Sequence, residues 1–298
     1  MTTPAGRKPF FISTFPLRSA TAMPHCTVNG CRYFYTDTGV PEDRPNAETI
    51  VFGHGFLMTH QLFENQIEAL GDEYRCIAFD WRGQGQSEVT AGGYGLWDLT
   101  DDVAALVEQL GAAPCHYVGH SMGGYVGFRL AMTRPDLLHR LALVDTQAGA
   151  EPLGKRLQYY LMLAFVRLFG YRSLVMDRVM PIMFGPAFRD DPAHRADLER
   201  WRTVIAANDR RGVFRTGVSI FSRADVLGRL PEIDTPTLLV VGEDDIATPP
   251  ATARDADGRL SRSELVVVPQ SGHSAPIEQP EAVSRALAGF FERGGDLS

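Results

Sequence analysis

The hydrophobic residues of this chain fall into short, wholly apolar runs that alternate with longer segments of helical spacing. Runs of four or five apolar residues are typical of buried strands, and a recurrence every three or four positions is typical of amphipathic helices. The predicted strands span 49–52, 76–79, 115–118, 141–144, 237–241 and 265–268, and the predicted helices 60–70, 99–110, 124–132, 250–257 and 281–291. Apolar strands separated by helices predict a mostly parallel central sheet with helices on both faces.

One element at the start of the pattern departs from this alternation. Asn29-Gly30 stands between two short strand-like runs. Asn-Gly is the strongest short-range signal for a two-residue hairpin turn. We therefore expect a pair of antiparallel strands at one edge of the sheet.

Residues 147–225 interrupt the alternation, because they contain no strand pattern and are rich in helically spaced aromatic residues and methionines. One expected helical face consists of Leu157, Tyr160, Leu161, Ala164, Phe165 and Leu168, and a second consists of Val175, Val179 and Met183. Such a segment predicts a helical cap inserted over the carboxyl edge of the sheet. Most of the first face is expected to pack in the interior, with Tyr160, Phe165 and Met183 lining a pocket.

The chain is accordingly divided into a core of residues 25–146 and 226–298 and a cap of residues 147–225. Residues 1–24 contain Pro9 and Pro16 and no continuous apolar helix, so they make a poor signal peptide and predict a mobile tail. The most apolar stretch, 157–169, is shorter than the roughly 20 residues needed to cross a bilayer.

The composition narrows the class of partner. The 298 residues carry a net charge of −7 and no basic run, which makes nucleic acid and membranes poor partners and favours a small-molecule substrate. The four cysteines form no Cys-x-x-Cys pair, so we expect reduced thiols and a cytoplasmic protein. No cluster of His, Cys and carboxylate residues has the spacing of metal ligands, and no cofactor or metal is expected. The oligomeric state stays open.

A candidate nucleophile lies in the sequence Gly119-His120-Ser121-Met122-Gly123, directly after one predicted strand and before a predicted helix. A serine on so sharp a turn takes a strained backbone conformation, which requires small residues two positions to either side. The turn exposes the hydroxyl next to the free N–H groups of the helix. We therefore predict that Ser121 is a nucleophile.

A serine hydroxyl needs a base to take its proton. His273 lies in a loop directly after the strand 265–268, and no other histidine after Ser121 has such a position. Asp245, in the loop after the strand 237–241, is the favoured acid, because it would orient the imidazole and stabilise its charged form. Asp145, which follows the strand 141–144, stays open as the alternative acid.

Two further loops follow predicted strands. In His54-Gly55-Phe56 the amide of Phe56 is expected to form an oxyanion hole with that of Met122, while His54 braces the loop. Residues 80–87 hold glycines after a strand but lack the third glycine of a dinucleotide fingerprint, so we interpret them as a loop hydrogen-bonded internally through Asp80, Arg82 and Ser87.

Together these segments make residues 25–291 similar to the α/β-hydrolase superfamily. The motifs are His-Gly-Phe at 54–56, Asp-x-Arg-Gly-x-Gly-x-Ser at 80–87, Gly-His-Ser-Met-Gly at 119–123, Gly-Glu-Asp-Asp at 242–245 and Gly-His at 272–273. Within the superfamily, 242–250 and 272–280 resemble the 3-oxoadipate enol-lactonase and esterase-like group. The resemblance implies an α/β-hydrolase fold and hydrolysis of a carboxylic ester or lactone.

The resemblance also bears on the mechanism. Haloalkane dehalogenases and soluble epoxide hydrolases of this fold use an aspartate where Ser121 stands, so an acyl-enzyme is favoured over an alkyl-enzyme. Other reactions remain open for the same three residues, namely hydrolysis of a carbon–carbon bond and cofactor-free dioxygenation. A small-molecule receptor that keeps the residues without turnover is the non-enzymatic alternative.

Overall fold

The computed structural model describes residues 25–293, so the tail predicted over 1–24 lies outside the described residues. An eight-stranded sheet forms its centre, in the order β1-β2-β4-β3-β5-β6-β7-β8. The strands are β1 (His25–Val28), β2 (Cys31–Asp37), β3 (Thr49–Gly53), β4 (Arg75–Phe79), β5 (Cys115–His120), β6 (Leu138–Val144), β7 (Thr237–Gly242) and β8 (Ser263–Val268). Strands β1 and β2 are antiparallel, as the Asn29-Gly30 turn predicts, and β3 to β8 run parallel. The predicted sheet is confirmed.

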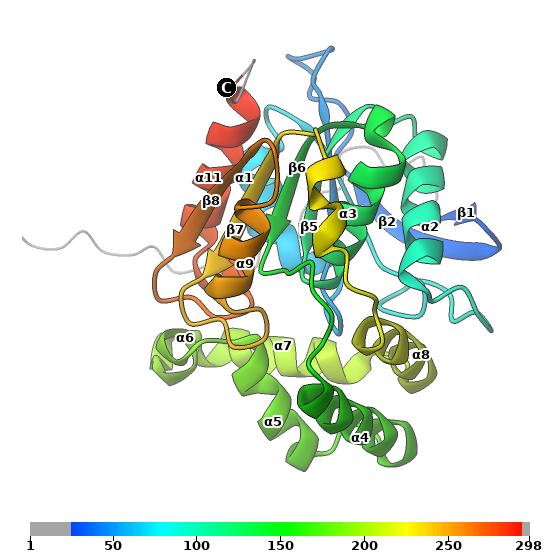
Figure 1. Ribbon diagram of the computed structural model, residues 1–298, viewed down its shortest axis with the longest axis vertical. Coiled ribbons are helices and arrows are strands. Elements are labelled where there is room, and N and C mark those ends of the chain that lie inside the picture. The colour runs from blue at the N-terminus through cyan, green and yellow to red at the C-terminus, as the bar shows by residue number, and fades with distance from the viewer. Residues whose placement is uncertain (1–24, 294–298) are drawn as a thin grey trace, which may run out of the picture.

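Helices cover both faces of this sheet, which explains why its inner strands are wholly apolar (Figure 1). On one face α2 (Leu96–Gln109), α3 (Met122–Thr133) and α9 (Pro250–Asp257) pack against alternate strand residues such as Val51 and Leu141. On the other, α1 (Glu64–Leu70) and α11 (Pro280–Glu292) pack against Ile50 and Val118. A short helix, α10 (Ala275–Glu278), precedes α11. All four cysteines are buried free thiols.

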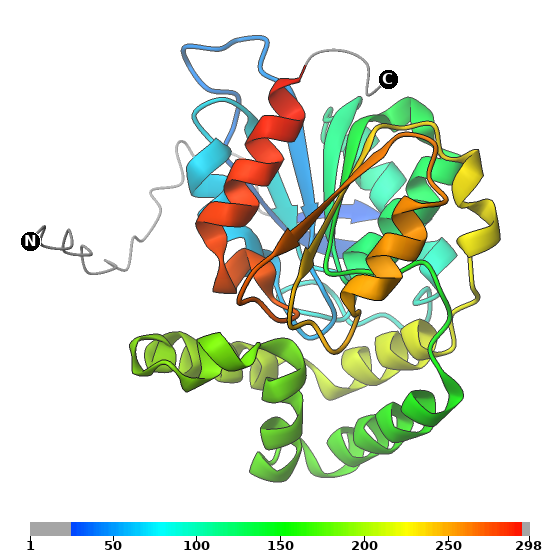
Figure 2. The same ribbon diagram turned by 60° about the vertical axis from the view of Figure 1, so that its left-hand side comes forward.

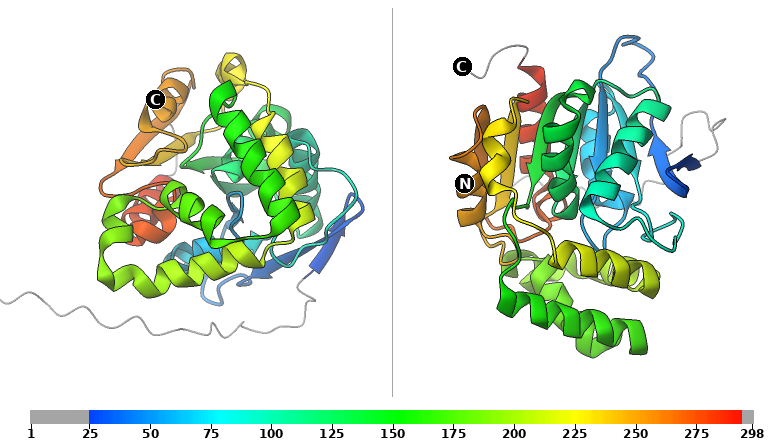
Figure 3. Two further views of the ribbon diagram at one scale, coloured as in Figure 1. Left: turned by 90° about the horizontal axis from the view of Figure 1, so that it is seen from below. Right: turned by 45° about the vertical axis from the view of Figure 1, so that its right-hand side comes forward.

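Between β6 and β7 the chain forms five α-helices, and we call residues 147–225, which contain them, the cap. The helices are α4 (Leu153–Phe169), α5 (Ser173–Met183), α6 (Pro186–Asp190), α7 (Arg195–Ala207) and α8 (Arg210–Phe221). They lie together beyond the carboxyl ends of the parallel strands, with α4 and α5 farthest from the sheet (Figures 1 and 2). Seen from below, they extend across that end of the core (Figure 3). The cap therefore stands over the loops that carry the candidate site.

The orientation of α4 differs from the sequence-based expectation. Leu157, Leu161 and Leu168, predicted to pack inside, are 63%, 64% and 68% exposed. Leu163 and Val166, on the other side of the helix, are buried instead. The prediction is wrong because α4 is apolar on nearly all sides, so its periodicity does not reveal which face points inward. None of the helices in residues 25–293 has both the length and the apolar character that a membrane span requires.

Candidate active site

Ser121 occupies the sharp turn between β5 and α3, with a φ of 49° and a ψ of −109°. The flanking glycines are required by the space around this turn. A Cβ on Gly119 would lie 2.4 Å from the carbonyl oxygen of Gly123, and a Cβ on Gly123 would lie 2.0 Å from that of Gly53. These separations are far below van der Waals contact, so the strained backbone at Ser121 depends on both glycines.

Ser121, His273 and Asp245 form one hydrogen-bonded chain across the carboxyl ends of three strands. The Ser121 hydroxyl is 2.9 Å from His273 Nε2, and His273 Nδ1 is 2.8 Å from Asp245 Oδ2. The carboxylate of Asp245 is itself held by the backbone N–H groups of Ala247 and Thr248 and by the Thr248 hydroxyl, at 2.8, 2.9 and 2.7 Å. The imidazole is thereby fixed with Nε2 available to the serine.

Burial and charge act against each other in this chain. Burial alone lowers the pKa of His273, but the charge and hydrogen bond of Asp245 outweigh it, so the pKa of His273 is raised above its ordinary value. Burial raises the pKa of Asp245, and its interactions with His273 and Thr248 outweigh that effect and lower it. A base with a raised pKa next to an ionised acid is suited to receive a proton from the serine.

The partner of His273 Nδ1 is Asp245, whereas the alternative acid, Asp145, binds backbone groups of the neighbouring loops. Its two oxygens accept the backbone N–H groups of Gly242 at 2.8 Å and Ala275 at 2.9 Å. Burial, together with the charge of Asp245, raises the pKa of Asp145 well above its ordinary range. Since Gly242 precedes the Asp245 loop and Ala275 follows His273, Asp145 ties these two loops together.

His120, which the sequence analysis did not single out, supports the same loops. Its Nε2 donates to the carbonyl oxygen of His273 at 2.6 Å. Burial and the nearby His273 lower the pKa of His120 to about 3, so this ring is neutral at physiological pH. The sequence gives no sign of this role, because the partner of His120, His273, lies 153 positions away along the chain.

The loop of residues 54–56 approaches Ser121 closely. A Cβ on Gly55 would lie 2.3 Å from His120 Nδ1 and 3.2 Å from the Ser121 Cβ. His54 braces this loop, because its carbonyl oxygen and its Nε2 accept the ring and backbone N–H groups of Trp81 at 2.6 and 3.2 Å. Phe56 therefore lies beside Ser121 at the pocket, and Met122 is the first residue of α3.

The loop 80–87 forms hydrogen bonds both within itself and to other parts of the core, so the prediction of internal bonding holds for Ser87, holds in part for Asp80 and is wrong for Arg82. The Asp80 carboxylate accepts the backbone N–H groups of His60 and Gln86 at 2.7 and 2.8 Å, and the Ser87 hydroxyl donates to the Asp80 carbonyl at 2.6 Å. The Arg82 guanidinium forms a buried ion pair with Asp102 at 2.7 Å. These bonds hold the loop against residues 60 and 102 of the core.

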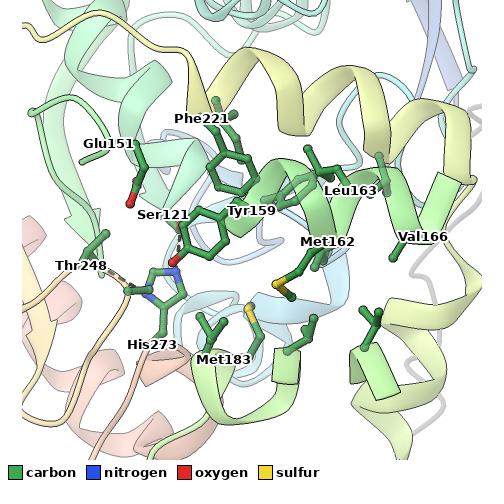
Figure 4. A pocket seen from close by; sticks show the side chains of 18 of the residues that line it. Ser121, Glu151, Tyr159, Met162, Leu163, Val166, Met183, Phe221, Thr248 and His273 are labelled. Atoms are coloured by element: carbon green, nitrogen blue, oxygen red, sulfur yellow. Dashed lines mark hydrogen bonds between the residues drawn. The ribbon is translucent and has the colours of Figure 1, made fainter. Parts of the chain in front are cut away.

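A pocket of about 860 Å³, its open mouth included, extends from Ser121 and His273 into the cap. In Figure 4, Ser121, Thr248 and His273 lie together at one end of the pocket, and Leu163 and Val166 of α4 lie at the other. Apolar residues of α5 and α8 complete the walls. The α4 residues in the wall are Tyr159, Met162, Leu163 and Val166. Of the residues predicted to line the pocket, Met183 does so, whereas Tyr160 and Phe165 do not, because α4 turns its other face inward.

The pocket that Ser121 lines also contains one carboxylate, that of Glu151. Glu151 is 6% exposed, and its Oε2 accepts from Arg223 Nη2 at 3.2 Å. Arg223 also donates to the carbonyl oxygens of Gly149 and Ile220, both at 2.9 Å, and its guanidinium stacks over Tyr125. This pair connects the segment that enters the cap to the one that leaves it, and the sequence analysis missed it because the two residues lie 72 positions apart.

A second buried carboxylate connects the cap to the His273 loop. Glu278 accepts the backbone N–H groups of Gly272 and Ser274, on either side of His273, at 2.9 and 3.1 Å. The same carboxylate accepts the N–H of Gly185, between α5 and α6, at 2.9 Å. Burial raises the pKa of Glu278, although the three N–H groups favour its charged form.

Comparison with known proteins is consistent with this geometry. Residues 48–280 match the family described as the alpha/beta hydrolase fold. The chain is 29% identical over 267 residues to a protein assigned as the carbamate hydrolase RutD in Rhizobium rhizogenes, with 86% of this chain and 97% of that protein covered. Because the family match spans most of the chain, the protein belongs to the α/β-hydrolase fold family.

Two solved structures of comparable size are similar throughout. A thermophilic esterase from Thermogutta terrifontis superposes with a TM-score of 0.81 at 29% identity, covering 91% of this chain and 97% of its own. An enol-lactonase from Burkholderia xenovorans LB400 superposes with a TM-score of 0.82 at 28% identity, covering 90% and 99%. Together with the family match, these similarities support a hydrolase of the α/β-hydrolase fold.

Proposed function

We propose that this protein is a serine hydrolase that cleaves an uncharged carboxylic ester or lactone through an acyl-enzyme. The observation that carries the proposal is the hydrogen-bonded chain of Ser121, His273 and Asp245 at the polar end of an apolar pocket. Similar proteins named as an esterase and an enol-lactonase act on bonds of this class. We expect a small-molecule substrate and a reaction in the cytoplasm, as the composition of the chain predicts.

In the proposed mechanism, Ser121 Oγ attacks the carbonyl carbon while His273 Nε2 takes the hydroxyl proton. Asp245 accepts from His273 Nδ1 and stabilises the imidazolium. The backbone amides of Phe56 and Met122 donate to the developing oxyanion, and each such donor contributes about 3 kcal/mol in comparable sites. His273 then protonates the leaving alcohol, and a water activated by the same imidazole hydrolyses the acyl-enzyme.

The pocket supports a substrate with an elongated apolar group. Its walls carry Met162, Leu163 and Val166, which have no polar group to pair with a charged substrate. Burying a CH₂ group contributes about 0.8 kcal/mol, so each added methylene of an acyl chain strengthens binding until the pocket is filled. The Glu151 carboxylate disfavours substrates that carry a carboxylate of their own near the ester.

The test is a series of 4-nitrophenyl esters from acetate to decanoate, measured under pre-steady-state conditions. We expect a burst of nitrophenolate equal to the enzyme concentration and a kcat/KM that rises with chain length before it falls. A fluorophosphonate should add its mass to Ser121, as read by peptide mass spectrometry. Thermal stabilisation by esters without any product would instead favour the receptor alternative, and oxygen consumption without a burst would favour dioxygenation.

A further inference from the structure

The outer face of α4 carries an unusual amount of exposed apolar surface. Of the ten large apolar side chains that are well exposed in residues 25–293, six lie between positions 153 and 174. Four of them, Leu153, Leu157, Leu161 and Leu168, are 63–77% exposed, and we call these four the leucine stripe. Phe169 and Leu174 extend it at the turn between α4 and α5.

The spacing of the leucine stripe places it on one side of the helix. Residues four and seven positions apart lie on the same face, since an α-helix has 3.6 residues per turn. The opposite side, with Leu163 and Val166, forms the pocket wall. In Figures 1 and 3, α4 lies at the outer edge of the cap, away from the sheet. No described element therefore covers the stripe, and contiguous apolar patches of this kind mark interaction sites.

The charge around the leucine stripe differs in sign from that of the whole chain. The chain carries −7, yet α4 contains Lys155, Arg156 and Arg167 and no carboxylate, and Arg172 follows it. Arg156 and Arg167 are eleven positions apart, about three helical turns, so they share one flank of the stripe. Charges act at a surface over a Debye length of roughly 8 Å, so the local cations outweigh the distant carboxylates there.

This charge pattern discriminates between two possible partners of the leucine stripe, a second copy of the chain and an anionic lipid surface. If two copies packed their stripes antiparallel about a two-fold axis, the start of one stripe would meet the end of the other. Arg156 of each copy would then lie opposite Arg167 of the other, because in an isologous interface contacts between two different positions occur twice. Like charges at an interface disfavour association. An anionic lipid surface meets the same face with opposite charge, and a helix with leucines on one side and basic residues on its flank is typical of interfacial binding.

We propose that the leucine stripe docks the cap on an anionic lipid surface, with its leucines at the acyl boundary and Arg156, Arg167 and Arg172 at the headgroups. Each Lys or Arg near such a surface contributes about 1 kcal/mol, and binding grows with the apolar area inserted. Docking in this orientation holds the pocket one helix diameter from the lipid, since α4 forms the wall between them.

The experiment measures co-sedimentation of the full chain with sucrose-loaded vesicles. One set contains phosphatidylcholine with 30 mol% phosphatidylglycerol, and the other phosphatidylcholine alone. We expect binding to the anionic vesicles to be at least about tenfold stronger and to weaken in 0.5 M salt. A variant with Leu157→Gln, Leu161→Gln and Leu168→Gln should lose about tenfold or more, and Arg167→Glu should lose the preference for anionic lipid.

Two control variants test whether vesicle binding depends on the leucine stripe or only on the net charge and exposed apolar surface of the whole chain. Arg285→Glu on α11 changes the net charge as Arg167→Glu does, and Val40→Gln removes an exposed apolar side chain away from the cap. Neither should alter vesicle binding, and the triple leucine variant should keep wild-type turnover of a short soluble ester. The proposal is overturned if wild type and the triple variant bind anionic vesicles equally, or if neither binds. Light scattering gives a further test. If wild type forms dimers as its concentration rises and the triple variant does not, a second copy of the chain covers the stripe and the lipid proposal is overturned.

Discussion

The core and the cap contribute opposite kinds of surface to one pocket. From the core come the polar atoms, each fixed by several hydrogen bonds: Asp245 alone accepts four, from His273, Ala247 and Thr248. From the cap come apolar walls that are positioned by packing, as where Tyr159 stacks on Phe221 at 4.5 Å between ring centroids. Directional bonds tolerate little change, whereas packed walls tolerate changes of shape. Changes in the core should therefore abolish turnover, and changes in the cap should alter selectivity.

The largest effect is expected at Ser121. Replacing Ser121 with alanine removes the proposed nucleophile and should lower kcat by about 10⁵ to 10⁶. The melting temperature should stay within a few degrees, because only one hydroxyl is lost. Initial rates on 4-nitrophenyl butyrate and a thermal melt provide the measurement, with Ser222→Ala on the cap side as the control. Residual activity within tenfold of wild type would show that another group attacks the ester.

The next largest effect is expected at Asp245, and it is compared with the effect at Asp145, the other buried acid of the core. Asp245→Asn should lower kcat by about 10⁴, because an amide favours the wrong imidazole tautomer. Asp145→Asn keeps one acceptor for two backbone N–H groups, so it should act mainly by lowering the free energy of unfolding, by about 1–3 kcal/mol. Rates and urea unfolding of both variants check this. If the Asp145 variant were inactive but stable, Asp145 and not Asp245 would be the acid that pairs with His273.

The pH profile gives an independent measure of the same pair. His273 must be neutral to accept a proton, and Asp245 raises its pKa, so wild-type kcat/KM should rise with pH through a value above 6.5. In Asp245→Asn the charge that raises this pKa most is gone, while burial, which lowers it, and the smaller effects of Asp145 and Glu278 remain. The residual activity of that variant should therefore persist to lower pH than in wild type. An unshifted or alkaline-shifted profile would contradict the proposed role of Asp245.

The core was predictable from sequence because its signals are local. The run Cys115–Val118 and the motif around Ser121 each fit within a few positions, and the order of strands and loops then fixed the places of Asp245 and His273. The inward face of α4 was not predictable, because this helix is apolar on both sides and its contacts are made with residues such as Phe221, far along the chain. The pairing of Glu151 with Arg223 likewise exists only after folding.

Whether a cap residue selects the substrate depends on whether it lines the pocket, and the two faces of α4 allow a test within one helix. Met162 lines the pocket and Leu161 points outward, although the two are adjacent. Met162→Ala should lower kcat/KM for a decanoate ester by about tenfold, since it removes several buried apolar groups, and change that for an acetate ester less than twofold. Leu161→Ala should leave both soluble substrates unaffected. Equal losses on both esters in Met162→Ala would indicate a general packing role.

The smallest effect is expected at Glu151, the one place where the cap presents a charge to the pocket. Its carboxylate forms an ion pair with Arg223, and both side chains are buried. The electrostatic potential in the pocket therefore depends on the negative charge of Glu151 offsetting the positive charge of Arg223. Glu151→Gln keeps a hydrogen-bond acceptor for Arg223 but removes the negative charge, which leaves the pocket more positive. A monoester of succinic acid should then gain about five- to tenfold in kcat/KM relative to the uncharged butyrate ester, a change of about 1 kcal/mol at the effective dielectric of a partly solvated site. Glu64→Gln, which removes the charge from an exposed pair with Arg200, is the matched control and should change neither substrate. If the Glu151 variant loses activity on both esters equally, the carboxylate holds the cap in place and does not select the substrate.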